Sequence, residues 1–196
     1  MTTTTPTRPN AVAIGKRAAE IHTAIETDGE FDRLTSSSLK YADCWASFTG
    51  YPLIPEWDED TDKEPLYREG LKVLALKAAV WEATNGDEHA AELLVSSPVD
   101  EMVHAILAQT NLAVRISERT GIPFVHMTDC EEFGWEPGDY TESSYRAAGW
   151  GTPPERYWIG ATEAKRRLGI LNDALGNAGF GAFGKSHSFT FTQTAA

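Results

Sequence analysis

The sequence has few cysteines, since Cys44 and Cys130 are the only two among 196 residues. So small a number excludes the disulfide framework that stabilises many small secreted domains. Long apolar runs are also missing, because no stretch approaches the roughly 20 apolar residues that a membrane-spanning helix needs. The opening residues, MTTTTPTRPN, lack the apolar middle of a secretory signal. We therefore expect a cytoplasmic protein that makes no membrane contact.

Positive charge is scarce as well. The chain has 17 lysines and arginines against 29 aspartates and glutamates, which gives a net charge of −12. Such a balance opposes binding to a phosphate backbone, so we expect no nucleic-acid partner. The hydrophobic share of 41% and the charged share of 23% are typical of a globular chain that folds around one core.

Helical periodicity of apolar residues runs through most of the chain. The expected helices cover 11–27, 36–50, 65–84, 87–94, 98–120, a segment that starts at the capping box 152–155, and a segment that carries three leucines and ends at 176. The helix at 98–120 has the longest apolar stripe and is expected to form the centre of the core. Acidic residues with prolines or glycines predict loops over 51–64 and 128–140; the first lacks the EF-hand pattern, so we expect a solvated loop there rather than a calcium site.

These segments predict a mainly α fold, a single-domain helical bundle with a glycine-rich C-terminal tail. The helical domain is expected over 10–176. Residues 1–9 are expected to form a disordered N-terminal tail, because the Thr/Pro run there has nothing to bury. Residues 177–196 are expected to form the glycine-rich tail.

One string in that tail imitates a nucleotide site. Residues 179–186 read GFGAFGKS, which matches the phosphate-binding pattern G-x-x-x-x-G-K-[ST]. A real phosphate loop needs a buried strand before it and a helix after it, whose N-terminal N–H groups hold the phosphates. Here the preceding residues are helical by period and only ten residues follow Ser186. We therefore interpret the string as a glycine-rich turn.

A metal site is the chemical hypothesis that the sequence favours. Asp100 and His104 are four residues apart in the expected helix 98–120, so their side chains project from the same face. His126 follows soon after the helix stop at Gly121 and is expected to fold back beside them. Two imidazoles and one carboxylate suit a divalent ion, Fe or Zn, with open coordination positions.

Three further residues are candidates for positions around that metal. Arg115 is expected to continue the polar edge of the same helix, while Cys130 and Tyr145 follow in the downstream loop and beyond it. Two other interpretations of the ligand set stay open. Asp100 and His104 would also form a metal-free acid–base pair, or have structural roles only, with Asp100 completing a capping box.

The same residues carry a resemblance to a known family. Residues 98–110, PVDEMVHAILAQT, followed by Gly121 and the segment 124–126, resemble the central block of the bacterial glycine-rich domain-containing protein-like family. That block reads roughly V-D-x-x-W-H-x-x-I-L-x-T, and then has a glycine and a histidine-bearing segment. The resemblance covers residues 96–158 and implies a helical domain followed by glycine-rich sequence. It implies no particular reaction.

Asp100, His104 and His126 match the family block, whereas Val103 stands where the family has tryptophan and Val125 where it has the first of two histidines. Our leading hypothesis is a metal-binding protein, and more specifically a metal-dependent enzyme that acts on a small molecule or a peptide. The alternative is a non-catalytic interaction module or accessory module of a biosynthetic pathway. In that alternative, exposed aromatic residues would recruit a partner protein; the candidates are Trp57, Trp135 and Trp150.

Overall fold

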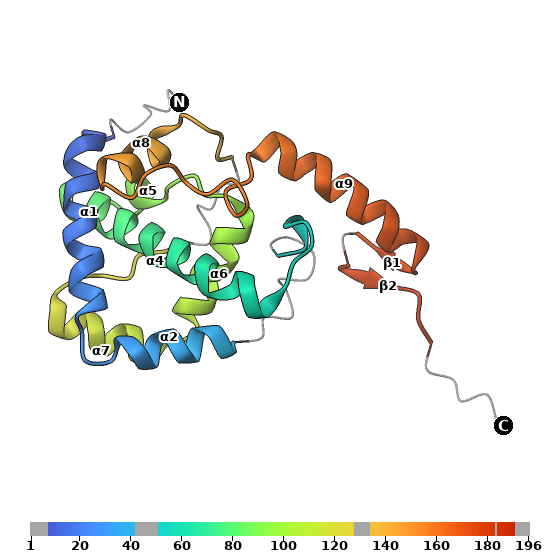
Figure 1. The fold of residues 1–196 in the computed structure, drawn as a ribbon, viewed down its shortest axis with the longest axis horizontal. Helices are drawn as coiled ribbons and strands as arrows, with labels where there is room; N and C mark the ends of the chain where they lie inside the picture. The colour runs from blue at the N-terminus through green and yellow to red at the C-terminus, as the bar shows by residue number, and fades with distance from the viewer. Residues whose placement is uncertain (1–7, 42–50, 128–133, 183, 191–196) are drawn as a thin grey trace.

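The computed structural model describes residues 8–41, 51–127, 134–182 and 184–190. The prediction of a mainly α protein is confirmed, because helices make up most of these residues and the strands form a single two-stranded sheet. Figure 1 shows the body of the bundle with α9 extending away from it and the small sheet lying near the far end of that helix. None of the helices in the described part is long and apolar enough to cross a membrane.

The elements follow one another in a simple order. They are α1 (Ala11–Glu26), α2 (Phe31–Lys40), the 3-10 helix η1 (Tyr51–Leu53), α4 (Glu59–Ala83), α5 (Glu88–Ala91), α6 (Ser97–Leu107), α7 (Thr110–Thr120), α8 (Tyr140–Ala147), α9 (Ala161–Asn177), β1 (Phe180–Gly181) and β2 (Ser186–His187). Helix α4 lies at the centre of the core, with α1, α6 and α8 packed around it.

Helix α1 forms as its sequence predicts. The side chain of Asn10 accepts hydrogen bonds from the backbone N–H groups of Val12 and Ala13, which caps the helix. The apolar stripe faces α4 and is buried; it consists of Ile14, Ala18, Ile21 and Ile25. The predictions of this helix and of its apolar face are therefore confirmed.

The predicted loop over 51–64 is too long, and the predicted helix start at Pro65 is wrong. Helix α4 begins at Glu59, and Pro65 lies inside it. The side chain of Asp58 caps the helix by accepting from the backbone N–H of Thr61. The first turn of α4 carries several acidic side chains, and their negative charge interacts favourably with the positive end of the helix dipole. The acidic residues that suggested a loop therefore stabilise the start of a helix.

Asp62 ties this first turn of α4 to a distant part of the chain. Its carboxylate is buried and accepts two hydrogen bonds from the guanidinium of Arg156, at 2.5 and 2.7 Å, and one from the hydroxyl of Tyr157. These donors, together with the backbone N–H of Asp58, lower the pKa of Asp62 to about 2. The carboxylate of Asp62 is therefore ionised in the folded protein at neutral pH, and the guanidinium of Arg156 balances its charge.

This low pKa predicts a specific loss of stability in acid. Because the pKa of Asp62 is lower in the folded than in the unfolded chain, its contribution is present above about pH 4 and disappears as the pH falls towards about 2. We expect Asp62→Asn to be less stable than the wild type by about 1–2 kcal/mol at pH 5 and nearly equal to it at pH 2. Urea unfolding of both proteins across this range measures the difference. A difference that does not change with pH would contradict the assignment.

The expected helix 98–120 is two helices rather than one. Helix α6 ends at Leu107, and α7 begins at Thr110 after a break at Ala108 and Gln109. Thr110 and Asn111 are weak helix formers that bond locally, as in the hydrogen bond from the Thr110 hydroxyl to the carbonyl of Leu107. The change of direction also alters which side chains are buried: Val114, placed in the apolar stripe by a continuous helix, is 49% exposed.

Two other helix predictions are also wrong. The second helix covers Phe31–Lys40 and contains Ser36–Ser38, which were expected to start it; the remaining inward-facing positions of that prediction lie in 42–50, outside the described residues. The capping box at 152–155 starts no helix, because Pro154 disfavours a helical conformation of the residue before it. Ser96 then holds the following segment in place, donating to the carbonyl of Tyr157 and accepting from the N–H of Ile159.

Helix α8 is an element that the sequence analysis missed. It begins at Tyr140 and is capped by Asp139, whose side chain accepts from the backbone N–H of Glu142. Asp139 looks like part of the acidic, aromatic segment before it. The helix that follows has only eight residues, which is too short for a helical period of apolar residues to be recognised.

The C-terminal segment forms a hairpin at the end of α9. Helix α9 ends at Asn177, as the leucine spacing predicts, and β1 then pairs antiparallel with β2. The string at 179–186 therefore lies across this hairpin, and no helix follows it among the described residues. It lacks the strand and helix that a phosphate-binding loop requires, in agreement with the sequence interpretation.

Candidate metal centre

Helix α6 positions two of the three predicted ligands. Asp100 lies in its first turn and His104 one turn later, and the nearest carboxylate oxygen is 3.4 Å from the Nδ1 of His104. Asp100 is buried, whereas the His104 side chain is 33% exposed. One ligand of the pair is thus fixed in the protein interior and the other reaches the surface.

The third ligand arrives on an extended segment after α7. Gly121 ends that helix in the left-handed conformation, at φ 70°, which reverses the chain with no steric cost to a glycine. Ile122 and Val125 are buried on the way back, and they anchor the segment. His126 follows, with its Nε2 at 2.9 Å from the Nε2 of His104 and its side chain only 4% exposed.

Asp100, His104 and His126 therefore converge as the sequence predicts. Each offers one ligand atom, and these atoms all lie within 4.8 Å of one another. Two nitrogens that each bind one ion at about 2.1 Å would be separated by about 3.0 Å at a right angle and about 3.4 Å at the tetrahedral angle. The observed 2.9 Å is close to the first value. These three residues could hold a metal ion.

A buried ion pair adjoins His126, and the sequence analysis missed both of its members. Lys77 of α4 is fully buried, and its Nζ lies 2.5 Å from a carboxylate oxygen of Glu92 and 2.9 Å from the Nδ1 of His126. The other oxygen of Glu92 accepts from the backbone N–H of Met127, at 3.2 Å. Both the ring and the backbone of the His126 segment are thus held by this pair.

The signal for Lys77 was present in the sequence. It is the only charged residue in the run VLALKAAV at 73–80, and α4 buries every position of that run. A lone lysine inside such a run has to find an anion in the interior. Its partners depend on the tertiary fold, because the carboxylate of Glu92 is 15 residues away along the chain and the ring of His126 is 49 residues away.

The electrostatics of the site favour a neutral imidazole at His126. Burial, followed by the charge of Lys77 and the proximity of His104, lowers the pKa of His126 to about 3. The ring therefore carries no net charge near neutral pH. A neutral imidazole is the form that binds a metal ion.

The contact with Lys77 also bears on the tautomer of His126. An ammonium that donates to Nδ1 leaves the ring proton on Nε2, which then faces the Nε2 of His104 as a hydrogen-bond donor. A ring that binds a metal through Nε2 carries its proton on Nδ1 instead, and this proton would point at the ammonium of Lys77, which lies 2.9 Å from Nδ1. The contacts as they stand therefore fit the hydrogen-bonded chain, and a metal centre requires Lys77 to release Nδ1 while it stays paired with Glu92.

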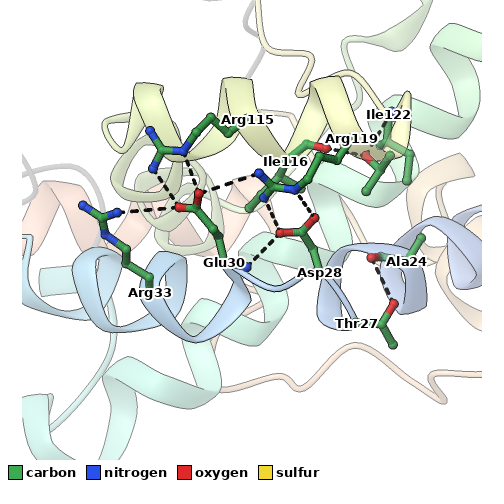
Figure 2. Close-up of polar contacts among 10 residues, drawn as sticks. Ala24, Thr27, Asp28, Glu30, Arg33, Arg115, Ile116, Arg119 and Ile122 are labelled. Atoms are coloured by element: carbon green, nitrogen blue, oxygen red, sulfur yellow. Dashed lines mark hydrogen bonds and ion pairs between the residues drawn. The ribbon is translucent and has the colours of Figure 1, made fainter.

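The other candidate positions around the metal have partners of their own. Arg115 donates two hydrogen bonds of 2.7 Å to the carboxylate of Glu30, in the turn between α1 and α2 (Figure 2). The break after α6 explains this outcome, because α7 no longer continues the edge that carries Asp100. Tyr145 donates to Glu69 and accepts from Lys72 in the packing of α8 against α4. Cys130 lies outside the described residues.

The aromatic anchors of the alternative hypothesis are less exposed than expected. Trp135 is buried and packs edge-on against Trp158. Trp57 is half-buried and stacks on Tyr51, and Trp150 is half-buried against Tyr145. The expectation that these three tryptophans are exposed is therefore wrong for Trp135, and it holds only in part for the other two.

Comparison of the chain with models of protein families, with curated proteins and with solved structures found no match. The resemblance over residues 96–158 therefore stays a prediction, and the geometry of the three ligands carries the functional argument.

Proposed function

We propose that the protein binds one divalent metal ion through Asp100, His104 and His126. We further propose that it is an enzyme that uses this ion to act on a small molecule or a peptide. The observation that carries the proposal is the convergence of two imidazole nitrogens and a carboxylate oxygen within 4.8 Å. A set of two histidines and one carboxylate leaves coordination positions open and suits Fe(II) or Zn²⁺. A metal held in this way polarises a substrate oxygen or activates a bound water.

The ligands and the residues around them have different roles in such a centre. Asp100 and His126 are buried and fix two ligand atoms, while the exposed edge of His104 leaves one side open to solvent and substrate. Glu92 holds the backbone of the His126 segment in place, and Lys77 lies against the ring of His126 from the interior. Groups that hold a ligand from behind are needed for a site that keeps its geometry during a reaction.

Metal analysis of protein purified without a histidine tag tests the proposal. After incubation with Zn²⁺ or Fe(II) and gel filtration, we expect about one equivalent of metal per chain in the wild type. His104→Ala should retain less than about a tenth of that amount, because a two-ligand site binds divalent ions weakly. His187→Ala is the control, since His187 is exposed on the C-terminal hairpin and should leave the metal content unchanged. A wild type that retains no metal would overturn the proposal.

A second function is favoured by the contact between Lys77 and His126. If the ammonium donates to Nδ1, the chain Glu92–Lys77–His126–His104–Asp100 forms a continuous hydrogen-bonded path, the last contact being 3.4 Å long. Such a path supports a metal-free acid–base site at the exposed His104. Nitrogen-15 NMR of the imidazoles separates the two functions: the metal site requires the proton of His126 on Nδ1, and the acid–base site requires it on Nε2.

A further inference from the structure

A groove of about 370 Å³ runs along the outer face of α7, and its walls are mostly apolar. It lies between that helix and the segment that returns to His126. Its lining residues are Leu107, Thr110, Ala113, Val114, Ser117, Glu118, Pro123 and Phe124. The volume is at the lower end of what small-molecule sites occupy.

Two residues that line the groove are close in the chain to the metal ligands. On α6, Leu107 lines the groove and lies three residues after His104, which is about one helical turn, or about 5 Å. On the returning segment, Phe124 lines the groove and lies two residues before His126. Each wall of the groove thus has a residue that lies near one of the two histidines along the chain, and these histidines are in contact with each other.

Only one of the three ligand side chains is substantially exposed to solvent. The His104 side chain is 33% exposed, while those of Asp100 and His126 are 3% and 4% exposed. A molecule that reaches the metal therefore approaches past His104. Among the described residues that line the groove, only Glu118 is charged, and it belongs to the last turns of α7, well beyond Leu107.

We propose that this groove binds the apolar tail of the substrate, whose polar head group reaches the metal held by Asp100, His104 and His126. The inference rests on the proposed function and adds a substrate class to it: a small amphiphilic molecule with one metal-binding head group and an aliphatic or aromatic tail. The positions of Leu107, one helical turn from His104, and of Phe124, two residues from His126, carry the argument together with the exposure of His104. Burial of the tail against Val114 and Phe124 would supply affinity that the small head group alone lacks.

A series of straight-chain hydroxamates on the metal-loaded protein tests this inference. Hydroxamates bind Zn²⁺ and Fe through the head group, and the tail is lengthened from acetohydroxamate to octanohydroxamate. We expect the affinity, measured by calorimetry, to rise by about two- to four-fold for each added methylene until the groove is filled. Val114→Asp should abolish this rise and leave the affinity for acetohydroxamate unchanged. Val114 is exposed, so the variant is expected to fold.

The matched control is Val12→Asp, because Val12 is equally exposed, at 54%, but lies on α1. It should keep the full dependence on chain length. If acetohydroxamate binds and longer tails add nothing, the groove inference is wrong while the metal site stands. If Val114→Asp keeps the dependence, the tail binds elsewhere and the inference is likewise overturned. If no hydroxamate binds because no metal is held, both proposals fail together.

Discussion

Replacing Lys77 by methionine is expected to lower the free energy of unfolding by about 3–5 kcal/mol. The lysine is fully buried, and its ammonium lies 2.5 Å from the carboxylate of Glu92. Methionine fills a similar volume but leaves that carboxylate in the interior without its cation. Urea unfolding at neutral pH measures the loss, and Lys165→Met on the exposed face of α9 is the control, with an expected change below about 0.5 kcal/mol.

A double variant separates the lost charge balance from the lost packing. Lys77→Met combined with Glu92→Gln removes both charges and keeps an oxygen that can accept from the N–H of Met127. We expect it to recover at least half of the stability that the single variant loses, because replacing both members of a buried pair is often nearly neutral. A double variant as unstable as the single one would show that the uncompensated carboxylate is not the cause.

Replacing Gly15 by alanine is expected to destabilise the protein by at least about 3 kcal/mol, although alanine is the better helix former. A Cβ atom at this position would lie within 2.6 Å of the Cβ of Ala147 and the backbone N of Ala148, and closer still to the backbone oxygen of Ser144. Two of these three atoms are backbone atoms, one in α8 and one in the residue that caps its C-terminus, and backbone cannot yield as a flexible side chain does. The substitution therefore has to push α1 and α8 apart.

Gly169→Ala is the matched control for this prediction. Gly169 lies inside α9, and a Cβ there meets nothing within 4 Å. The same chemical change is thus expected to raise the free energy of unfolding by up to about 1 kcal/mol. Thermal unfolding of the two variants should give changes of opposite sign. If Gly15→Ala is as stable as the wild type, the close approach of α1 and α8 is wrong.

The sequence predicts those features that depend on residues close together in the chain. Asn10 and the stripe that follows it define α1, and the four-residue spacing of Asp100 and His104 places both on one face of α6. The position of His126 follows from the helix stop at Gly121, which turns the chain back within a few residues. These are local rules of capping and periodicity, and they hold because nothing in the tertiary structure opposes them.

The features that sequence reasoning missed depend on contacts between distant residues. Asp62 looks like part of an acidic loop until Arg156, 94 residues later, binds its carboxylate. Lys77 looks incidental until Glu92 and His126 meet its ammonium in the core. Arg115 looks like a neighbour of the metal until Glu30 is seen to hold it (Figure 2). In each case the pairing depends on how helices pack, which periodicity does not encode.

The interruption between α6 and α7 shortens the path that the chain has to cover on its return to the metal site. In a straight helix, Gly121 would lie about 25 Å along the axis from His104, whereas the five residues from Gly121 to His126 span at most about 18 Å when fully extended. The two histidine side chains would then have to bridge a backbone gap of about 7 Å by reaching towards each other. The change of direction at Ala108 and Gln109 brings the end of α7 closer to α6, so two residues outside the ligand set ease the meeting of the imidazoles.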